Sequence, residues 1–299
     1  GGRGRALGST KPQLMELLTA LRDAAHRLER AGVPTPGVDA EILLSYLLGV
    51  TRGALLADAQ TGKTLSASRQ AEWESMVSRR EAREPLQHIT GTAPFMDFEV
   101  VVGDGVFVPR PETQALVEAA ITHAQSIAVG ESGLHIADLC SGSGVVALSL
   151  ARAVPQAHVV AVEASEQAIA YLTRNVADLA PDVEVVQASV EQLDRASARF
   201  DMILANPPYV PVSEVPNEPE VAHFDPAIAL FGGEDGLDTV REIVDYALGA
   251  LRPGGYLAIE HSNLQGQALR ELLRGAGFFG VETEKDFVGR ERFTRGFRP

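Results

Sequence analysis

Cysteine is almost absent from this chain of 299 residues, in which Cys140 stands alone. One cysteine excludes an intramolecular disulfide and is typical of proteins in a reducing compartment. Residues 1–10 contain arginine but no apolar stretch follows them, so we expect no secretory signal peptide. The sequence therefore predicts a cytoplasmic protein.

Long apolar runs and paired metal ligands are also missing. The apolar stretch Val145–Val154 is too short to cross a bilayer and contains Arg152. The seven histidines include no pair spaced as His-x-x-x-His. We therefore expect no membrane span and no metal ion.

Charge is unevenly divided along the chain. Residues 1–85 hold 12 Lys and Arg against 10 Asp and Glu, whereas residues 86–299 hold 14 against 30. Tight non-specific binding of nucleic acid needs several cationic side chains on phosphates, so the acidic part favours a protein partner or a small substrate. Acidity that only keeps the protein soluble explains the same charges equally well.

The sequence does contain periodic patterns of apolar residues, and its 299 residues are enough for two domains. Residues 1–85 have apolar residues at helical spacing, and no alternating strand pattern comes before residue 98. This predicts a small helical bundle. Its helices are expected from Ser9 or Thr10 to Gly32, from a cap at Asp39 to Leu48, and from Ser66 or Ser68 to Arg83.

Residues 98–109 form two β-rich runs around Gly103-Asp104-Gly105, which predicts a β-hairpin. We place it in a linker, 86–110, between the helical domain, 1–85, and a second domain, 111–299. In the second domain a helix is followed by alternating strands and helices, which predicts an α/β fold with a doubly wound parallel sheet. The strands are expected at 135–139, 158–163, 183–187, 200–205, 256–261, 279–286 and 291–296.

Asn206, Pro207, Pro208 and Tyr209 directly follow a short apolar strand. In an open α/β sheet, ligands bind outside the carboxyl ends of the strands. Proline fixes φ and has no N–H, so this turn is stiff and its carbonyls are free to accept hydrogen bonds. The Asn206 side-chain oxygen and the Pro207 carbonyl can receive both protons of a planar NH2 group, on which Tyr209 can stack. The tetrapeptide predicts a cradle for an amide or an exocyclic amine.

A glycine-rich turn, residues 138–144, ends the first strand of the predicted sheet. It lacks the Gly-x-Gly-x-x-Gly and Gly-Lys-Ser/Thr patterns, which argues against dinucleotides and triphosphates. Glu163 ends the next strand, where an acid can accept both hydroxyls of a ribose. A nucleoside cofactor without phosphate, held in this way, indicates S-adenosylmethionine.

With these motifs the chain resembles the HemK/PrmC family, the glutamine methyltransferases that modify class I peptide release factors. The resemblance runs almost from end to end and implies a class I S-adenosylmethionine-dependent methyltransferase fold. Such a fold is Rossmann-like, with a mostly parallel seven-stranded sheet, here joined to a small N-terminal helical bundle that recognises the substrate. Besides Asn206–Tyr209, the matching segments are 39–44, 84–91, 107–113, 225–237 and 289–292.

The resemblance also implies roles for individual residues. S-adenosylmethionine, which leaves as S-adenosylhomocysteine, would be held by Asp138, Cys140, Ser141, Gly142, Ser143, Gly144, Glu163, Val190 and Asn206. The catalytic residues would be Asn206, Pro207 and Tyr209, and Pro208 and Arg110 would help them to hold the target glutamine. The chain departs from the family at Cys140, where glycine is usual, at Glu163, where aspartate is usual, and at Ser189-Val190, where an acid and tryptophan are usual.

Other functions stay open at this point. An enzyme that methylates a glutamine of a ribosomal protein would carry the same tetrapeptide, and adenine-amino methyltransferases of DNA or RNA share it. The acidic second part and the lack of a basic recognition domain argue against nucleic acid. A binding module that has lost activity is disfavoured by the intact glycine turn, Glu163 and Asn206. Cys140 is expected to behave as a small buried side chain rather than as a nucleophile.

Overall fold

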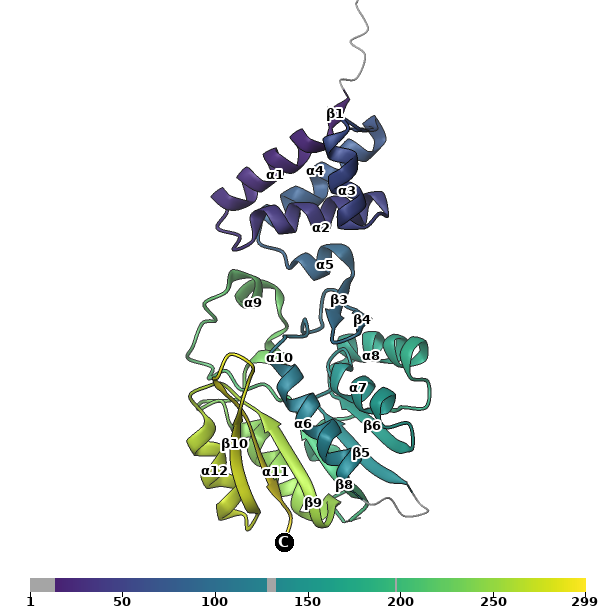
Figure 1. The fold of residues 1–299 in the computed structure, drawn as a ribbon. Coiled ribbons are helices and arrows are strands. Elements are labelled where there is room, and N and C mark those ends of the chain that lie inside the picture. Colours follow the sequence, from purple (N-terminus) through teal and green to yellow (C-terminus); the bar gives the residue numbers. More distant parts are fainter. Residues whose placement is uncertain (1–13, 128–132, 197) are drawn as a thin grey trace, which may run out of the picture. The chain divides into compact units, whose positions relative to one another are not determined.

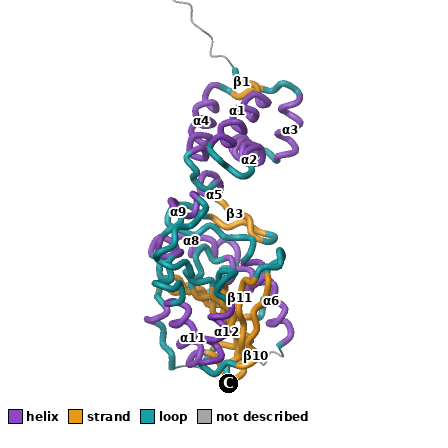
Figure 2. The backbone as a smooth tube through the Cα atoms, turned by 90° about the vertical axis from the view of Figure 1, so that its left-hand side faces the viewer, coloured by secondary structure: helices purple, strands orange, loops and turns teal. Residues whose placement is uncertain are grey.

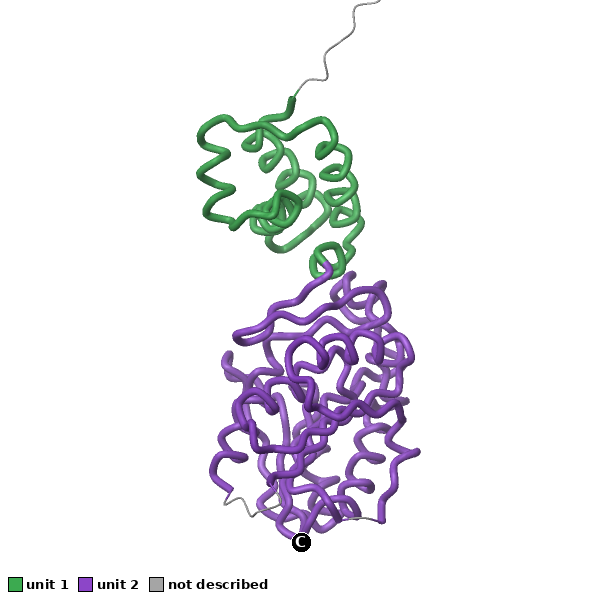
Figure 3. Tube along the Cα trace, turned by 90° about the vertical axis from the view of Figure 1, so that its right-hand side faces the viewer, with its two compact units in different colours: residues 1–90 green, residues 91–299 purple. Residues whose placement is uncertain are grey.

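The computed structural model describes residues 14–127, 133–196 and 198–299. The chain divides into two compact units, residues 1–90 and 91–299 (Figure 3). The first unit is helical, and the second contains a large sheet with helices on both faces (Figures 1 and 2). Each unit has its own hydrophobic core.

The first unit is the helical bundle that the sequence predicts. Its core is built mainly of leucines from three helices, together with Trp73 and Met76. A buried ion pair, 2.7 Å from Arg80 Nε to Asp39 Oδ2, joins two of its helices. Its elements are β1 Met15–Glu16, α1 Leu17–Arg30, α2 Pro36–Leu48, α3 Arg52–Gln60, β2 Thr64–Leu65, α4 Ala67–Glu81 and α5 Leu86–Thr90.

Some helix boundaries differ from the expected ones. Asp39 does not cap α2, because it lies buried in the first turn and its carboxylate pairs with Arg80. Helix α3 is not among the predicted helices, since it buries only Leu55 and Ala59 and so has a weak apolar pattern. The expected caps Ser9 and Thr10 lie outside the described residues.

A hairpin does form within residues 86–110, but its predicted position is wrong. Its strands are β3 Thr92–Phe95 and β4 Phe98–Val101, so the turn is at Met96-Asp97. Residues 103–105 lie in the following loop, where the Tyr171 hydroxyl donates to the Asp104 carbonyl at 3.1 Å. The pairing of buried Phe95 with Phe98 outweighs the local turn preference of the glycines.

A seven-stranded sheet is the centre of the second unit and confirms the predicted fold class. Its order is β10-β11-β9-β8-β5-β6-β7, with β11 antiparallel to its neighbours and the other pairs parallel. Strands β6 and β7 lie on one side of β5, and β8 and β9 lie on the other, so the strand order reverses at β5, where ligands bind in such sheets. The strands are β5 Leu134–Leu139, β6 Ala157–Glu163, β7 Glu184–Gln187, β8 Phe200–Ala205, β9 Leu251–Glu260, β10 Phe279–Lys285 and β11 Glu291–Phe297.

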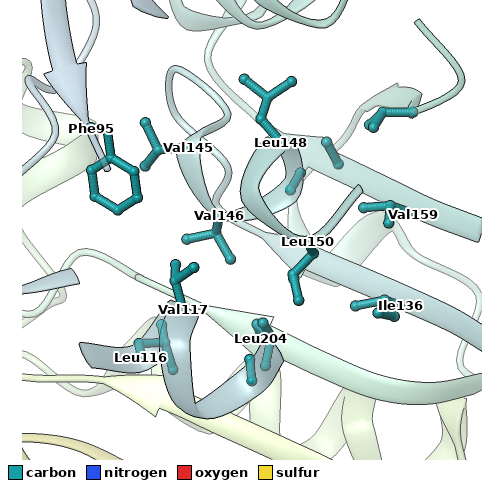
Figure 4. Close-up of a cluster of buried hydrophobic side chains, with 14 of the residues drawn as sticks. Phe95, Leu116, Val117, Ile136, Val145, Val146, Leu148, Leu150, Val159 and Leu204 are labelled. Atoms are coloured by element: carbon teal, nitrogen blue, oxygen red, sulfur yellow. The ribbon is translucent and has the colours of Figure 1, made fainter. Parts of the chain in front are cut away.

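Helices cover both faces of this sheet. Helices α6 Thr113–Ser126, α7 Val145–Ala153 and α8 Glu166–Leu179 pack on one face, and α11 Asp238–Ala250 and α12 Gly266–Gly275 on the other. Alternate residues of β8 supply the two cores: Met202 and Leu204 join the first, and Ile203 and Ala205 the second. Figure 4 shows part of the first core.

Three short elements lie in the loops that follow β7 and β8. They are the 3-10 helix η1 Val190–Gln192 and the helices α9 Pro219–Phe224 and α10 Ala227–Leu230. No single helix in the described part of the chain is long and apolar enough to span a membrane. Helices α2 and α3 pass that test only as a pair, and the chain bends by 93° between them.

Candidate active site

A cavity of about 640 Å³ lies in the second unit, at the carboxyl ends of β5, β6 and β8. Its wall contains almost all of the predicted site residues, which the parallel sheet therefore brings together. The predicted residues that line it are Arg110, Cys140, Ser141, Gly142, Ser143, Glu163, Val190, Asn206, Pro207, Pro208 and Tyr209. Asp138 and Gly144 are buried and are not part of the wall.

The turn after β5 exposes bare backbone to the cavity. The Ser141 N–H donates to the Val162 carbonyl at 2.9 Å, and the Ser141 hydroxyl donates to the Asp138 carbonyl at 2.9 Å. Gly142 has a φ of 56°, and a Cβ built there would meet nothing within 4 Å. The turn is thus held in shape while the space over Gly142 stays open to a ligand.

Cys140 adopts a backbone conformation that favours glycine. Its φ is 61°, a region that costs an ordinary residue about 1–2 kcal/mol. A glycine would adopt the same φ without this cost. Burial, together with the carboxylates of Glu163 and Asp138, raises the pKa of the Cys140 thiol. The thiol therefore stays neutral and is not a nucleophile.

Glu163 ties the glycine turn to the helix that follows β6. Its Oε2 accepts from the Gly142 N–H at 2.8 Å, and its Oε1 accepts from the Ser165 N–H at 2.8 Å. Each carboxylate oxygen has a second lone pair, so the side chain can still accept hydrogen bonds from hydroxyl groups in the cavity.

Asp138 lies beneath the turn and supports α7. Its Oδ2 accepts from the Ala147 N–H at 3.1 Å, and its Oδ1 has no partner among the described residues. Burial raises the pKa of Asp138 to about 7. Its carboxyl therefore keeps its proton to a higher pH than an exposed aspartate does.

Asn206–Tyr209 form the cavity wall after β8. The Asn206 Nδ2 donates to the Thr113 hydroxyl at 3.4 Å, and the Tyr209 carbonyl accepts from Gln265 Nε2 at 3.0 Å. The tetrapeptide is thus anchored at both ends. Burial raises the pKa of the Tyr209 hydroxyl, which stays protonated.

Two glycines support this tetrapeptide from behind. A Cβ on Gly232 would lie 2.5 Å from the Pro208 carbonyl oxygen, and a Cβ on Gly236 would lie closer still to the Tyr209 carbonyl oxygen. Backbone hydrogen bonds from Val210 to the Leu230 carbonyl (2.8 Å) and from Gly232 to the Val210 carbonyl (3.0 Å) fix the two segments together. A larger residue at either glycine would displace the cavity wall.

Arg110 connects two loops of the cavity wall. Its Nη2 lies 3.1 Å from Asp225 Oδ2, and its guanidinium lies over the Phe107 ring. The Asp225 side chain is 1% exposed, and its burial raises the pKa of the carboxyl to about 6 despite the nearby Arg110 charge. The loop before α6 and the loop between α9 and α10 are held together by this pair.

Val190 and Glu260 complete the wall. Val190 is buried at the start of η1, where its apolar side chain can pack on a planar ring. Glu260, the last residue of β9, is missed by the sequence reasoning although it ends a strand in the same way as Glu163. Burial raises its pKa to about 7, and its Oε2 has no partner among the described residues.

The described residues include no group of three or more His, Cys, Asp or Glu side chains that could hold a metal ion. The residues do fit a nucleoside cofactor: an open backbone turn, a carboxylate at the end of the next strand and an apolar Val190 face one cavity. Together with the sheet order, this defines a class I S-adenosylmethionine-dependent methyltransferase.

Sequence matches to known proteins identify the family of this chain. Residues 19–91 match the PrmC N-terminal domain, and residues 113–222 match the methyltransferase small domain. The release factor glutamine methyltransferase of Streptomyces coelicolor is 45% identical over 279 residues, which cover 93% of this chain and 96% of that protein. That of Mycolicibacterium smegmatis is 40% identical over 290 residues, covering 95% and 99%. The chain belongs to the family of release factor glutamine methyltransferases.

A solved structure supports the fold alone. The T. thermophilus 16S rRNA N2 G1207 methyltransferase, in complex with AdoMet and guanosine, matches with a TM-score of 0.50 and 23% identity. The match covers 70% of this chain and 50% of that one.

Proposed function

We propose that this enzyme methylates the side-chain amide of the glutamine in the Gly-Gly-Gln motif of class I peptide release factors. The observation that carries the proposal is the pair of acceptors at the end of β8, the Asn206 side chain and the Pro207 carbonyl, on a stiff turn beside the glycine turn. The names of the relatives and the match over nearly the whole chain support the choice of a release factor.

The cofactor is held, in this proposal, by the turn Cys140–Gly144 and by the two strands beside it. When bound, S-adenosylmethionine supplies a methyl group on a positively charged sulfur. Glu163 would accept hydrogen bonds from the ribose hydroxyls and Val190 would pack on the adenine, while Asp138 supports the turn from below. Asn206, which lines the same cavity, would contact both the cofactor and the substrate amide.

Asn206 and Pro207 then prepare a weak nucleophile. An amide nitrogen reacts poorly because its lone pair is delocalised into the carbonyl. Hydrogen bonds from its N–H groups to the Asn206 oxygen and the Pro207 carbonyl increase the electron density at nitrogen and fix its direction. Tyr209 packs over the amide, and Pro208 keeps the turn rigid. Alignment thus supplies most of the rate, and no general base is needed.

Recognition of the release factor is assigned to the helical part of the chain. The functional division that we propose places recognition in residues 1–85, a linker in 86–110 and catalysis in 111–299. The match of residues 19–91 to the PrmC N-terminal domain and the separate core of the first unit support it. A substrate of this kind places the enzyme in the cytoplasm and requires no direct contact with nucleic acid or membrane.

One assay tests the proposal. The enzyme is incubated with labelled S-adenosylmethionine and, separately, with a release factor, its Gln→Ala variant, a ribosomal protein and DNA. We expect label on the release factor and none on the variant. Label on the variant or on DNA alone would overturn the proposal, and label on the ribosomal protein alone would identify the related enzyme instead.

A further inference from the structure

Glu260 is a buried carboxyl in the cavity wall that the proposed mechanism does not use. It is 2% exposed and lines the same cavity as Asn206. Its Oε2 has no partner among the described residues. A buried polar atom without a partner costs folding free energy, so its presence at the site needs a reason.

One hydroxyl connects Glu260 to Asn206. Thr113, the first residue of α6, is buried, and its Oγ1 accepts from the Asn206 Nδ2 at 3.4 Å. Thr113 and Glu260 line the same cavity wall, and the Thr113 hydroxyl favours the ionised form of the Glu260 carboxyl. Glu260, Thr113 and Asn206, which come from β9, α6 and the end of β8, therefore form a row of three side chains.

The row fixes the direction of the Asn206 amide. A hydroxyl has one proton to donate. When Thr113 donates it to the ionised Glu260, Thr113 can only accept from Asn206, so the Asn206 NH2 group faces Thr113. The Asn206 oxygen is then the free end of the amide. An amide turned over by 180° has nearly the same shape, so packing alone does not choose between the two directions.

We propose that Glu260 and Thr113 are positioning residues that hold the Asn206 amide with its oxygen available to the target NH2 group. This inference rests on the proposed function, because it takes Asn206 as an acceptor for the substrate amide. With the Asn206 amide turned over, an N–H donor would face another N–H donor, and no hydrogen bond would form.

When Glu260 is protonated, the direction of the Asn206 amide is no longer fixed. A neutral carboxyl can donate to Thr113, whose own proton is then free for the Asn206 oxygen, so that the amide can turn over. Burial raises the pKa of Glu260 to about 7, while the Thr113 hydroxyl and the Arg292 charge oppose the shift. The catalytic rate should therefore fall on the acid side of neutral pH.

The other charged groups around Glu260 come from several elements. Arg292 on β11 and Asp286 in the loop before it form an ion pair at 3.2 Å, and Glu112 precedes α6. Tyr209 also faces Glu260 and stays protonated. Burial lowers the pKa of the neighbouring His261, whose ring bonds the Ser262 carbonyl and the Thr294 hydroxyl.

Kinetics with a release factor as substrate test the inference. The parameters kcat and KM are measured between about pH 5.5 and pH 9. The wild type should lose kcat below a midpoint near pH 7. Glu260→Gln cannot ionise but keeps an accepting oxygen, so its kcat should not show this fall at acid pH, the acid limb of the profile.

Thr113→Val should lower kcat by about 30-fold or more at every pH, with S-adenosylmethionine affinity unchanged, and Thr113→Ser should restore kcat. The exposed Glu166, changed to Gln, is the matched control that keeps the limb.

A second readout separates this inference from the proposed function. The side-chain NH2 resonances of Asn206, assigned by their loss in Asn206→Ala, should shift with a midpoint near pH 7 in the full-length protein and stay fixed in Glu260→Gln. If they titrate although release factors are not methylated, the proposed function fails, and only the control of the Asn206 amide direction by Glu260 stands. If release factors are methylated but Glu260→Gln and Thr113→Val match the wild type in pH profile and kcat, the positioning role is wrong.

Discussion

Glu163 and Gly142 are joined by a hydrogen bond of 2.8 Å that links the ends of neighbouring strands β6 and β5. The other oxygen of the same carboxylate accepts from the Ser165 N–H at 2.8 Å. Because an ionised carboxylate only accepts hydrogen bonds, both of its oxygens suit these N–H donors. One side chain thus shapes the glycine turn and the start of α8 before any ligand arrives.

Replacing Glu163 by glutamine should therefore weaken S-adenosylmethionine binding about tenfold or more, since one N–H donor would face the glutamine Nε2. Titration calorimetry measures the dissociation constant. Glu166→Gln, an exposed change at the start of α8, is the matched control and should leave it within about twofold. Equal affinities for the Glu163 variant and the control would show that the carboxylate does not shape the cofactor site.

Asn206→Ala should abolish methyl transfer but keep cofactor binding. The alanine removes the acceptor for the target amide and leaves the turn Cys140–Gly144 and Glu163 intact. We expect kcat to fall by at least about 100-fold, with the dissociation constant of S-adenosylmethionine changed by less than about threefold. A parallel loss of both quantities in turnover assays and calorimetry would contradict the assigned role.

Cys140 offers a test of backbone strain. Cys140→Gly removes a Cβ from a positive φ but adds freedom to the unfolded chain, so the unfolding free energy should change by less than about 1 kcal/mol. Cys140→Val places a β-branched residue at the same φ and should cost about 2 kcal/mol. Urea denaturation measures both. A valine variant as stable as the glycine variant would rule out strain at this position.

The Arg110–Asp225 pair should stabilise the fold in a pH-dependent way. Arg110→Ala leaves the Asp225 carboxylate buried without its cation, which at pH 8 should cost about 1–2 kcal/mol, a figure reduced for the partial exposure of Arg110. The pKa of Asp225 is already raised to about 6, so at pH 5 the carboxyl is mostly neutral and the cost should be smaller. Adding Asp225→Asn should recover most of the loss at pH 8. A cost independent of pH in denaturation experiments would exclude the charge as its cause.

Asp138 should make stability fall as the pH rises. Burial raises its pKa from 3.8 to about 7, so the folded protein binds this proton more tightly than the unfolded chain. The stabilisation is complete below pH 3.8 and is lost progressively as the pH rises to about 7. Asp138→Asn has no such proton. Its unfolding free energy relative to wild type should therefore rise by about 2 kcal/mol between pH 5 and pH 8. An unchanged difference would show that the carboxyl ionises as easily when folded.

The sheet and most of the cavity wall are predictable from the sequence for one physical reason. Buried parallel strands are apolar runs, and the polar residues that end them gather at one edge of the sheet. Glu163 ends β6 and Asn206 follows β8, so local patterns identify both the strands and the site. The structure brings these two residues to one cavity, as the sequence predicts.

The features that escape prediction depend on contacts between distant segments. The hairpin turn at Met96-Asp97 follows from the pairing of Phe95 with Phe98 and not from the nearby glycines. Glu260 joins the site only because β9 pairs with β8, which no local pattern contains. Its neighbour Thr113 lies in a recognised segment, but its hydroxyl gains a function only beside Asn206.

Gly232 and Gly236 lie close to the backbone of Pro208 and Tyr209 in the acceptor turn, residues 206–209. This packing determines when the turn loses its conformational entropy. Glycines lose more conformational entropy on folding than other residues, whereas prolines have little to lose. The two prolines and the close contacts of the glycines with its backbone restrict the acceptor turn in the folded protein. The ordering of the turn is therefore completed once, when the chain folds, and is not repeated each time a glutamine side chain binds.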